Sequence, residues 1–386
     1  MSKKISQNLA YSWWVHNVAT VEDGTDNILF GGVKSDGSPR VFRREPGEDY
    51  TTIDNYTLYT APEADDHNAP SLISKAGKPL LAFWQRHGMS TTLNYWSAPE
   101  GTFTFGAKKT ITFPLNVTYC QSLVWDDNIY IFLRAGSEQW YYVRSTDWGM
   151  SWSTPVVFFS GVAETGQMYC RFKQHDNIAQ FAIYGHPSTS PWRDIVYGEI
   201  NLDNGDIMSN EEVVANLDGT SLPLTPSMLE VVCTPSAAPG EKVRLLDVTR
   251  TSIGTPTILF ARWNDANPIP VYYITQRGFY EPEIWDEKRL MSAGGVFDDG
   301  SNRKYVYGAA FGTDTLYVAL KDTCGTYKIK QFAIDAWGGL YDERLIQSNS
   351  TYPLARPYVV GDNVIWQELR EYTDYRNYLI HLWIKD

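Results

Sequence analysis

The stretch DNIYIFLRAGSEQWYYVRS, residues 127–145, decides the fold that the sequence predicts. An Asp–Asn pair opens an apolar run rich in Ile, Tyr, Phe and Leu, and after a short polar break a second run of Trp, Tyr and Val follows. Short runs of β-branched and aromatic residues bounded by turn residues are typical of strands. The stretch therefore predicts two neighbouring strands. Because helical periodicity is nearly absent from the rest of the chain, we expect an all-β fold.

Units like the first of these two runs recur along the chain, each with a turn residue followed at once by an apolar strand. They begin at Asp26, Gly77, Asp127, Asp176, Gly254, Asp314 and Asp362. Successive starts lie 51, 50, 49, 78, 60 and 48 residues apart. A repeat of about fifty residues is typical of the four-stranded blades of a β-propeller. The sequence therefore predicts a seven-bladed β-propeller with four-stranded antiparallel blades, as a single domain over residues 1–386.

Two segments add detail to this fold. The longest interval contains an insertion at about residues 204–242, rich in Ser, Thr, Pro and Leu, for which we expect a long loop between blades. The segment STDWGMSW, residues 145–152, fits the Asp-box pattern S-x-D-x-G-x-S-W. In that turn Asp147 can accept hydrogen bonds from backbone N–H groups, and Trp152 packs into the blade. The motif is typical of propellers, but its usual role is structural, so it says little about chemistry.

Composition and charge restrict the classes of partner. With 386 residues, of which 43% are hydrophobic and 14% aromatic, the chain can bury a large core. A net charge of -12 and a pI near 5.0 argue against a nucleic-acid or anionic-membrane binder, since such partners need a broad basic face. An anionic substrate would instead have to meet a local cluster of arginines. The four cysteines lack CxxC spacing, so we expect mostly buried thiols, with one disulfide left open.

Polar side chains from four blades are predicted to meet at one mouth of the central channel. In each blade the innermost strand precedes the marked turn, and the next strand runs back antiparallel to it. The start of the innermost strand and the end of the next strand therefore lie at the same end of the propeller. In blades two to five these positions hold His67, His87, Tyr119, Arg134, Tyr169, His186 and Arg262. Tyr119 and Tyr169 stand 50 residues apart, which is one repeat, so we expect them to be adjacent around the axis.

Each of these residues also has a structural interpretation. A His after two acids often caps a strand, a Tyr before a Cys often packs in the core, and an Arg at a strand end often forms a surface ion pair. Their shared place at the same end of the same four blades favours a functional site. His16 and His175 do not fall at these positions, and we expect them to be structural.

The predicted cluster favours one kind of chemistry on sugars. It has no obvious pair of carboxylates, so it is poorly suited to ordinary glycoside hydrolysis. It suits β-elimination on a uronic acid, which requires a neutralised C6 carboxylate, removal of the C5 proton and protonation of the departing O4. Arg134 could pair with the carboxylate in a bidentate manner, and His or Tyr side chains could act as base and acid.

The motifs around these residues resemble the BNR-repeat propeller family that includes ulvan lyases. The resemblance covers about residues 60–275 and rests on the ordered series DDHNAPSLI, AFWQRH, VTYCQSLVW, IYIFLRAGSEQWYYVRSTDWGMSW, MYCRF, FAIYGHP and ILFARW. It implies a polysaccharide lyase that cleaves a uronic-acid-containing polysaccharide, ulvan or a similar rhamnose–uronate polymer, by β-elimination. His67 and Tyr119 match the family's base and acid, in an order that depends on the stereochemistry of the sugar, and Arg134 matches its carboxylate-neutralising arginine.

The resemblance also implies binding roles. His87 and Tyr169 match residues that hold the sugar, and we count Arg171 and Arg262 with them as substrate-binding residues. His186 matches a metal-binding histidine, which implies a structural zinc or calcium ion, whereas the chemistry itself requires no cofactor. The expected partner is an anionic polysaccharide, with neither nucleic acid nor membrane. An extracellular or secreted location is expected although the chain begins without a signal peptide, and a viral or phage origin would also fit.

Two other functions remain open at this point. A sialidase shares the propeller and the Asp-box, but it would need an arginine triad, a Tyr–Glu nucleophile pair and an F/Y-R-I-P motif, for which SPRVF at residues 38–42 is a poor substitute. A noncatalytic propeller would recognise glycans through Trp and Tyr side chains at its mouth, and the chain is rich in both.

Overall fold

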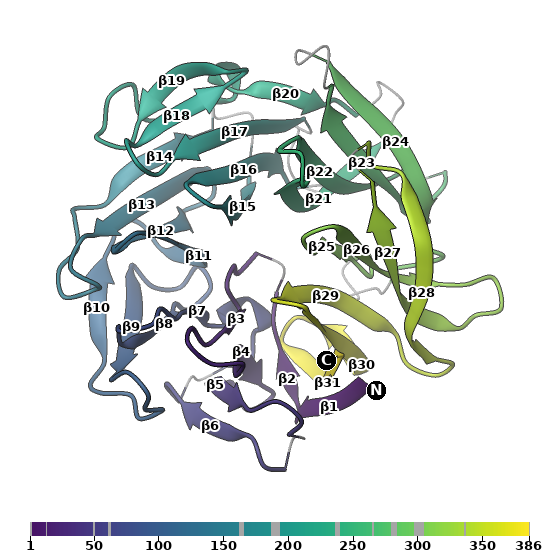
Figure 1. Cartoon of the computed structure of the whole chain (residues 1–386), viewed down its shortest axis with the longest axis horizontal. Helices are drawn as coiled ribbons and strands as arrows, with labels where there is room; N and C mark the ends of the chain where they lie inside the picture. The colour runs from purple at the N-terminus through teal and green to yellow at the C-terminus, as the bar shows by residue number, and fades with distance from the viewer. Residues whose placement is uncertain are drawn as a thin grey trace.

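The computed structural model describes residues 2–12, 14–48, 51–60, 63–161, 166–186, 194–235, 240–264, 266–278, 284–296, 305–335 and 337–385. The strands within these ranges form seven sheets, which are arranged around a central axis (Figure 1). This confirms the predicted seven-bladed propeller. No helix in the described ranges is long and apolar enough to cross a membrane.

The first three blades follow one another along the chain. Blade 1 contains β2 (Leu9–Ala10), β3 (Ala19–Val21), β4 (Ile28–Lys34), β5 (Pro39–Arg44) and β6 (Asp54–Thr57). A 3₁₀ turn, η1 (Asp66–Asn68), leads into blade 2, which contains β7 (Ser71–Ile73), β8 (Leu80–Trp84), β9 (Thr92–Ala98) and β10 (Lys109–Thr112). Blade 3 contains β11 (Val117–Trp125), β12 (Asn128–Ala135), β13 (Gln139–Ser145) and β14 (Val156–Ser160).

Blade 4 is larger than the others and corrects one expectation. It contains β15 (Met168–His175), β16 (Ile178–Gly185), β17 (Ile195–Asn201), β18 (Asp206–Ser209), β19 (Glu212–Asn216) and β20 (Glu230–Cys233), with η2 (Pro226–Met228) before the last strand. The insertion at 204–242 is therefore not simply a long loop. Both β18 and β20 pair with β17, and Ile207 and Ala215 of the insertion are buried, because short apolar runs lie between its Ser and Pro residues.

The last three blades complete the ring. Blade 5 contains β21 (Lys242–Arg250), β22 (Pro256–Trp263), β23 (Val271–Arg277) and β24 (Trp285–Ser292). Blade 6 contains β25 (Ala309–Phe311), β26 (Thr315–Lys321), β27 (Tyr327–Ile334) and β28 (Leu340–Asn349). Blade 7 contains β29 (Leu354–Val360), β30 (Asn363–Asp374), β31 (Asn377–Lys385) and β1 (Ser2–Gln7). Because β1 pairs with β31, the two ends of the chain lie side by side and close the ring (Figure 1).

The blades pack through apolar side chains. The strand β8 is buried along its whole length, whereas buried and half-buried residues alternate along β31. Trp140 and Trp366 are among the largest side chains with no exposed surface. The turn at residues 145–152 packs as expected, since Asp147 accepts a hydrogen bond from the backbone N–H of Ser151 and Trp152 lies edge-on to Phe83 and Tyr95. All four cysteines are free, which excludes the disulfide that the sequence left open.

Candidate active site

A small pocket of about 70 Å³ at one mouth of the channel collects most of the predicted residues. We call it the mouth pocket. Six of the seven residues that the repeat placed at this end line it, namely His67, His87, Tyr119, Arg134, Tyr169 and His186. Its other lining residues in the described part of the chain are Trp14, Gln167, Tyr184, Arg244, Tyr305 and Tyr375.

His67 is held by the turn that carries it. It lies in η1, where Asp65 is the N-cap residue and accepts a hydrogen bond from the His67 backbone N–H at 3.0 Å. The His67 Nδ1 atom lies 2.7 Å from Asp65 Oδ1 and 3.1 Å from Asp66 Oδ1. Because an ionised carboxylate only accepts hydrogen bonds, Nδ1 carries the proton in this arrangement. The ring nitrogen that is left for the pocket is Nε2.

His87 lies beside His67 and shares its carboxylate. The two imidazole rings stack with centroids 4.3 Å apart, and His87 Nδ1 lies 3.1 Å from Asp65 Oδ2. Burial, together with the nearby His67 imidazole, lowers the pKa of His87 to about 4, so the ring is neutral at neutral pH. Its Nε2 atom lies 3.4 Å from the Tyr119 hydroxyl and accepts the hydrogen bond that this hydroxyl donates.

Tyr119 reaches the pocket through an irregularity in β11. The pairing of β11 with β12 shifts register between Thr118 and Gln121, and Tyr119 in this bulge has φ 60°, an uncommon backbone conformation for a bulky residue. Strained backbone of this kind is often found at functional sites. Burial and the neighbouring Tyr169 raise the pKa of Tyr119 well above its ordinary value. The hydroxyl is therefore protonated at neutral pH and can donate.

Arg134 has an unusual environment for a buried cation. It lies on β12, is 5% exposed, and its guanidinium carbon is 4.7 Å from the Tyr119 ring centroid and 5.1 Å from that of Tyr169. Among the described residues it forms no ion pair, and its Nε and Nη1 atoms are buried without a hydrogen-bond partner. In contrast, the equally buried Arg171 and Arg356 each pair with a carboxylate. Arg134 is thus available to an anionic group that enters the pocket.

Arg171 and Arg262, predicted as substrate-binding residues, do not line the mouth pocket. The buried Arg171 pairs with Asp247 at 3.2 Å. Arg262 was expected at the mouth, but its side chain passes Tyr273 and reaches Glu287 on the outermost strand, with bonds of 3.0 and 2.7 Å. The repeat placed its backbone at the correct end of β22, but the direction of the side chain is set by the acid two strands away.

The pocket contains one group of side chains with the geometry of metal ligands. The ligand atoms of Asp65, His67 and His87 lie within 4.8 Å of one another, whereas His186 belongs to no such group in the ranges that the structure describes. Zinc accepts this donor set of imidazole and carboxylate. Here, however, the same atoms already bond to one another, so we assign no metal to them. The metal at His186 stays a prediction.

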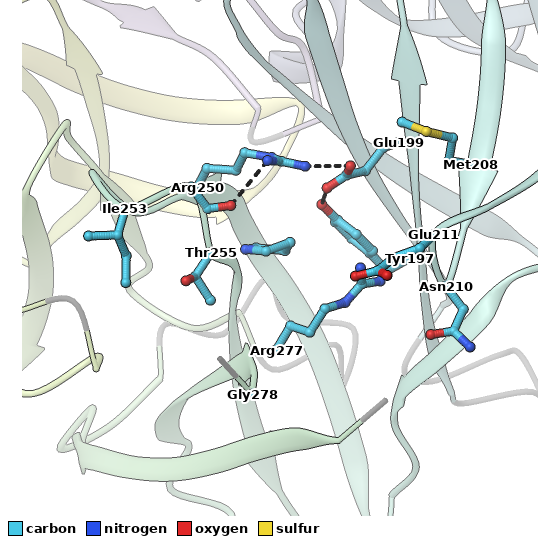
Figure 2. A pocket seen from close by; sticks show the side chains of 12 residues that line it. Tyr197, Glu199, Met208, Asn210, Glu211, Arg250, Ile253, Thr255, Arg277 and Gly278 are labelled. Carbon is cyan, nitrogen blue, oxygen red and sulfur yellow. Dashed lines mark hydrogen bonds and ion pairs between the residues drawn. The ribbon is translucent and has the colours of Figure 1, made fainter. Parts of the chain in front are cut away.

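A second pocket lies between blades 4 and 5, and we call it the side pocket (Figure 2). It has a volume of about 340 Å³, and the insertion forms one of its walls through Met208, Asn210 and Glu211. Figure 2 shows Arg250 bonded to Glu199, which also accepts a hydrogen bond from Tyr197. The other arginine of the side pocket, Arg277, pairs with Glu230. Because both arginines are neutralised, the side pocket is the weaker candidate although it is larger.

The fold and the mouth pocket define a class: a seven-bladed propeller that gathers His, Tyr and Arg side chains at one end of its channel. No family model matches the chain, and no characterised protein matches it in sequence. Among solved structures, a PL25 ulvan lyase bound to -[GlcA(1-4)Rha3S]- is similar, with a TM-score of 0.69 and 12% identity over 99% of this chain and 93% of that one.

Two further structures show the range of proteins that share this fold. The polysaccharide lyase Uly1 has a TM-score of 0.54 and 10% identity over 96% of this chain and 90% of its own. The BP39L lectin from Burkholderia pseudomallei has a TM-score of 0.57 and 11% identity over 98% and 96%. At such low identities the likeness establishes the propeller fold alone.

Proposed function

We propose that this protein is a polysaccharide lyase that cleaves a uronic-acid-containing polysaccharide, ulvan or a similar rhamnose–uronate polymer, by β-elimination. The observation that carries the proposal is Arg134, a buried guanidinium without a carboxylate partner in the described chain. A uronate carboxylate would supply that partner. The guanidinium would stabilise the uronate most strongly as the C5 proton leaves, because negative charge then spreads onto the carboxylate.

The neighbouring side chains support an assignment of base and acid. His67 Nε2 is the nitrogen left unprotonated by the bonds at Nδ1, so it takes the C5 proton. The electron pair of the C–H bond forms the C4–C5 double bond, and the C4–O4 bond breaks. Tyr119, protonated and held in the same pocket, delivers its proton to O4. The products are a 4,5-unsaturated uronate and a chain end with a free hydroxyl.

The structurally similar proteins and the residues that line the mouth pocket both bear on the choice between a lyase and a sialidase. The similarity in fold to two polysaccharide lyases agrees with the proposal. A sialidase is disfavoured, because the described lining residues of the mouth pocket include two arginines and no glutamate.

The decisive experiment incubates the protein with ulvan and then with other uronate polymers, and follows both the ultraviolet absorbance of the unsaturated product and the appearance of reducing ends. We expect both signals to rise together on at least one polymer. Reducing ends without the absorbance would contradict elimination and favour hydrolysis.

A noncatalytic glycan-binding propeller is the second candidate. The BP39L lectin has the same fold, and nine aromatic or imidazole rings line the described part of the mouth pocket, among them Trp14, Tyr169 and Tyr184. Such rings stack on sugars. Binding of a uronate polymer with neither signal of cleavage would favour this candidate over the lyase.

A further inference from the structure

A single buried carboxylate bonds to two of the three histidines that line the mouth pocket, His67 and His87. Asp65 is fully buried, and its Oδ1 atom lies 2.7 Å from His67 Nδ1 while its Oδ2 atom lies 3.1 Å from His87 Nδ1. The Nε atom of Arg376 lies farther away, 3.8 Å from Oδ2. Two imidazoles on separate segments of the chain, 20 residues apart, therefore take their orientation from one side chain.

We propose that Asp65 is a positioning residue that fixes both His67 and His87 as the tautomer protonated at Nδ1, so that both rings present an unprotonated Nε2 to the pocket. This inference rests on the proposed lyase function for its catalytic meaning, but the tautomers themselves are a property of the resting protein. Asp65 touches neither substrate nor a reacting atom, and it acts through the two histidines.

The chemistry needs this tautomer at both rings, for different reasons. A neutral imidazole has one donor and one acceptor nitrogen, and the partner of one nitrogen decides the state of the other. With Nε2 unprotonated, His67 can take a proton from the substrate. With Nε2 unprotonated, His87 accepts the hydrogen bond of Tyr119 and holds that hydroxyl in place. In the opposite tautomer His67 could not accept the proton of the substrate. His87 in that tautomer could not accept the hydrogen bond that orients the Tyr119 hydroxyl.

The nearby Asp66 does not take over this role. It lies 3.1 Å from His67 Nδ1, but its other oxygen accepts bonds from Arg356 at 2.5 Å and from the Tyr372 hydroxyl at 3.1 Å. Asp66 reaches only one of the two rings, and Arg356 balances its charge. Asp65 is the residue that links the two imidazoles.

Asp65 also caps η1, and a cap is the simplest structural reason for an Asp here. The substitution Asp65→Asn separates the two roles. Asn caps a helical turn about as well as Asp, and its Oδ1 can still accept from the backbone N–H and Nδ1 of His67. Its NH₂ group then faces His87 Nδ1, so His87 must become an acceptor there and carry its proton on Nε2.

The test combines nitrogen NMR of the histidine rings in the resting protein with steady-state kinetics. Ring signals are assigned by comparison with His67→Gln and His87→Gln variants. In the wild-type protein we expect both rings to be protonated at Nδ1. In Asp65→Asn we expect His87 to move to the Nε2-protonated tautomer, with kcat on the uronate polymer about 100-fold lower or more and KM changed by less than about threefold.

Glu199→Gln is the matched control, because Glu199 is also a buried, hydrogen-bonded carboxylate but lies in the side pocket. It should leave both tautomers and kcat unchanged. The proposal is overturned if either ring of the wild-type protein is protonated at Nε2, or if both rings keep the Nδ1 proton in Asp65→Asn. Wild-type protein that cleaves no uronate polymer would end the proposed function, whereas the NMR result would still decide the role of Asp65.

Discussion

The mouth pocket and the side pocket both contain two arginines next to tyrosines, but they differ in how the cations are balanced. In the side pocket Arg250 and Arg277 each pair with a glutamate. In the mouth pocket Arg134 lies against the rings of Tyr119 and Tyr169 and forms no ion pair with a described residue. A buried charge without a partner is costly, whereas a paired one is roughly balanced. The difference favours the mouth pocket as the functional site and a structural role for the paired charges of the side pocket.

The buried carboxylates of the two pockets also differ in what they bond to. Glu199 accepts from Arg250 and Tyr197, an arrangement that ties strands together. Asp65 instead bonds to the imidazole rings of two histidines. Burial would raise the pKa of Asp65, but the His67 imidazole and the hydrogen bonds from both rings hold it well below its usual range. An acid that organises titratable groups rather than a cation is typical of sites that transfer protons.

The largest expected effect tests the two arginines directly. Arg134→Ala should lower kcat/KM on the uronate polymer about 10³-fold, since it removes the cation that stabilises developing charge. Its free energy of unfolding should fall little, because no ion pair is lost. Arg250→Ala, the matched variant, should leave kcat/KM unchanged and lower the free energy of unfolding by about 1–3 kcal/mol. Equal kinetic losses in the two variants would contradict the division between the pockets.

A somewhat smaller effect is expected from the tyrosine hydroxyls. Tyr119→Phe keeps the ring under Arg134 but removes the proton donor, so kcat should fall about 10²–10³-fold with the fold intact. Tyr197→Phe removes a buried hydroxyl that bonds to Glu199 in the side pocket, and should change stability but not kcat. Stopped assays of product absorbance and thermal unfolding of both variants measure the two properties. Normal turnover by Tyr119→Phe would exclude it as the acid.

The sequence predicts much of the mouth pocket because its residues occupy equivalent places in a repeat. Seven turn-plus-strand units were enough to find the blades, and the ends of the first two strands in each unit point to His67, Tyr119 and Tyr169. The same reasoning placed Arg262 wrongly, since a strand position fixes the backbone end but not the partner of a long side chain. That partner, Glu287, lies on a strand with no marked motif.

Other residues of the mouth pocket could not be predicted from the sequence. Tyr305 and Tyr375 come from blades 6 and 7, whose motifs carried no histidine or arginine signal, and Trp14 comes from the N-terminal segment. Asp65 is the N-cap residue of η1, a role that the sequence analysis did not assign to it. Its second role depends on His87, 22 residues away, and only the closed ring brings that imidazole to the second oxygen. Such convergence depends on how the blades pack, which local spacing does not encode.

A third prediction uses pH to test the buried imidazole of the mouth pocket. The pKa of His87 is about 4 in the folded protein and near 6.5 when unfolded. Between these values the unfolded chain binds more protons, so the free energy of unfolding should fall as the pH drops from about 6.5 to 4, by up to about 3 kcal/mol from this residue. His87→Gln should flatten that part of the curve. Chemical denaturation of the wild-type protein and of this variant at several pH values measures the difference.

The smallest expected effect concerns backbone strain, which both pockets contain. Tyr119 and Glu211 have φ angles of 60° and 66°, and Glu211 occupies the second position of the two-residue turn between β18 and β19. If strain in the side pocket has no function, relieving it should only stabilise the protein. With Asn210 before it, Glu211→Gly would give the Asn-Gly pair that such turns favour. We expect about 1 kcal/mol of added stability in chemical denaturation and unchanged kcat.

The corresponding change at the mouth should behave in the opposite way. Tyr119→Gly relieves a similar backbone strain, but it also removes the ring under Arg134 and the hydroxyl that bonds to His87. Turnover should therefore be lost whatever happens to stability. A loss of turnover in Glu211→Gly would mean that the side pocket also serves catalysis, because strain would then be retained for function at both places.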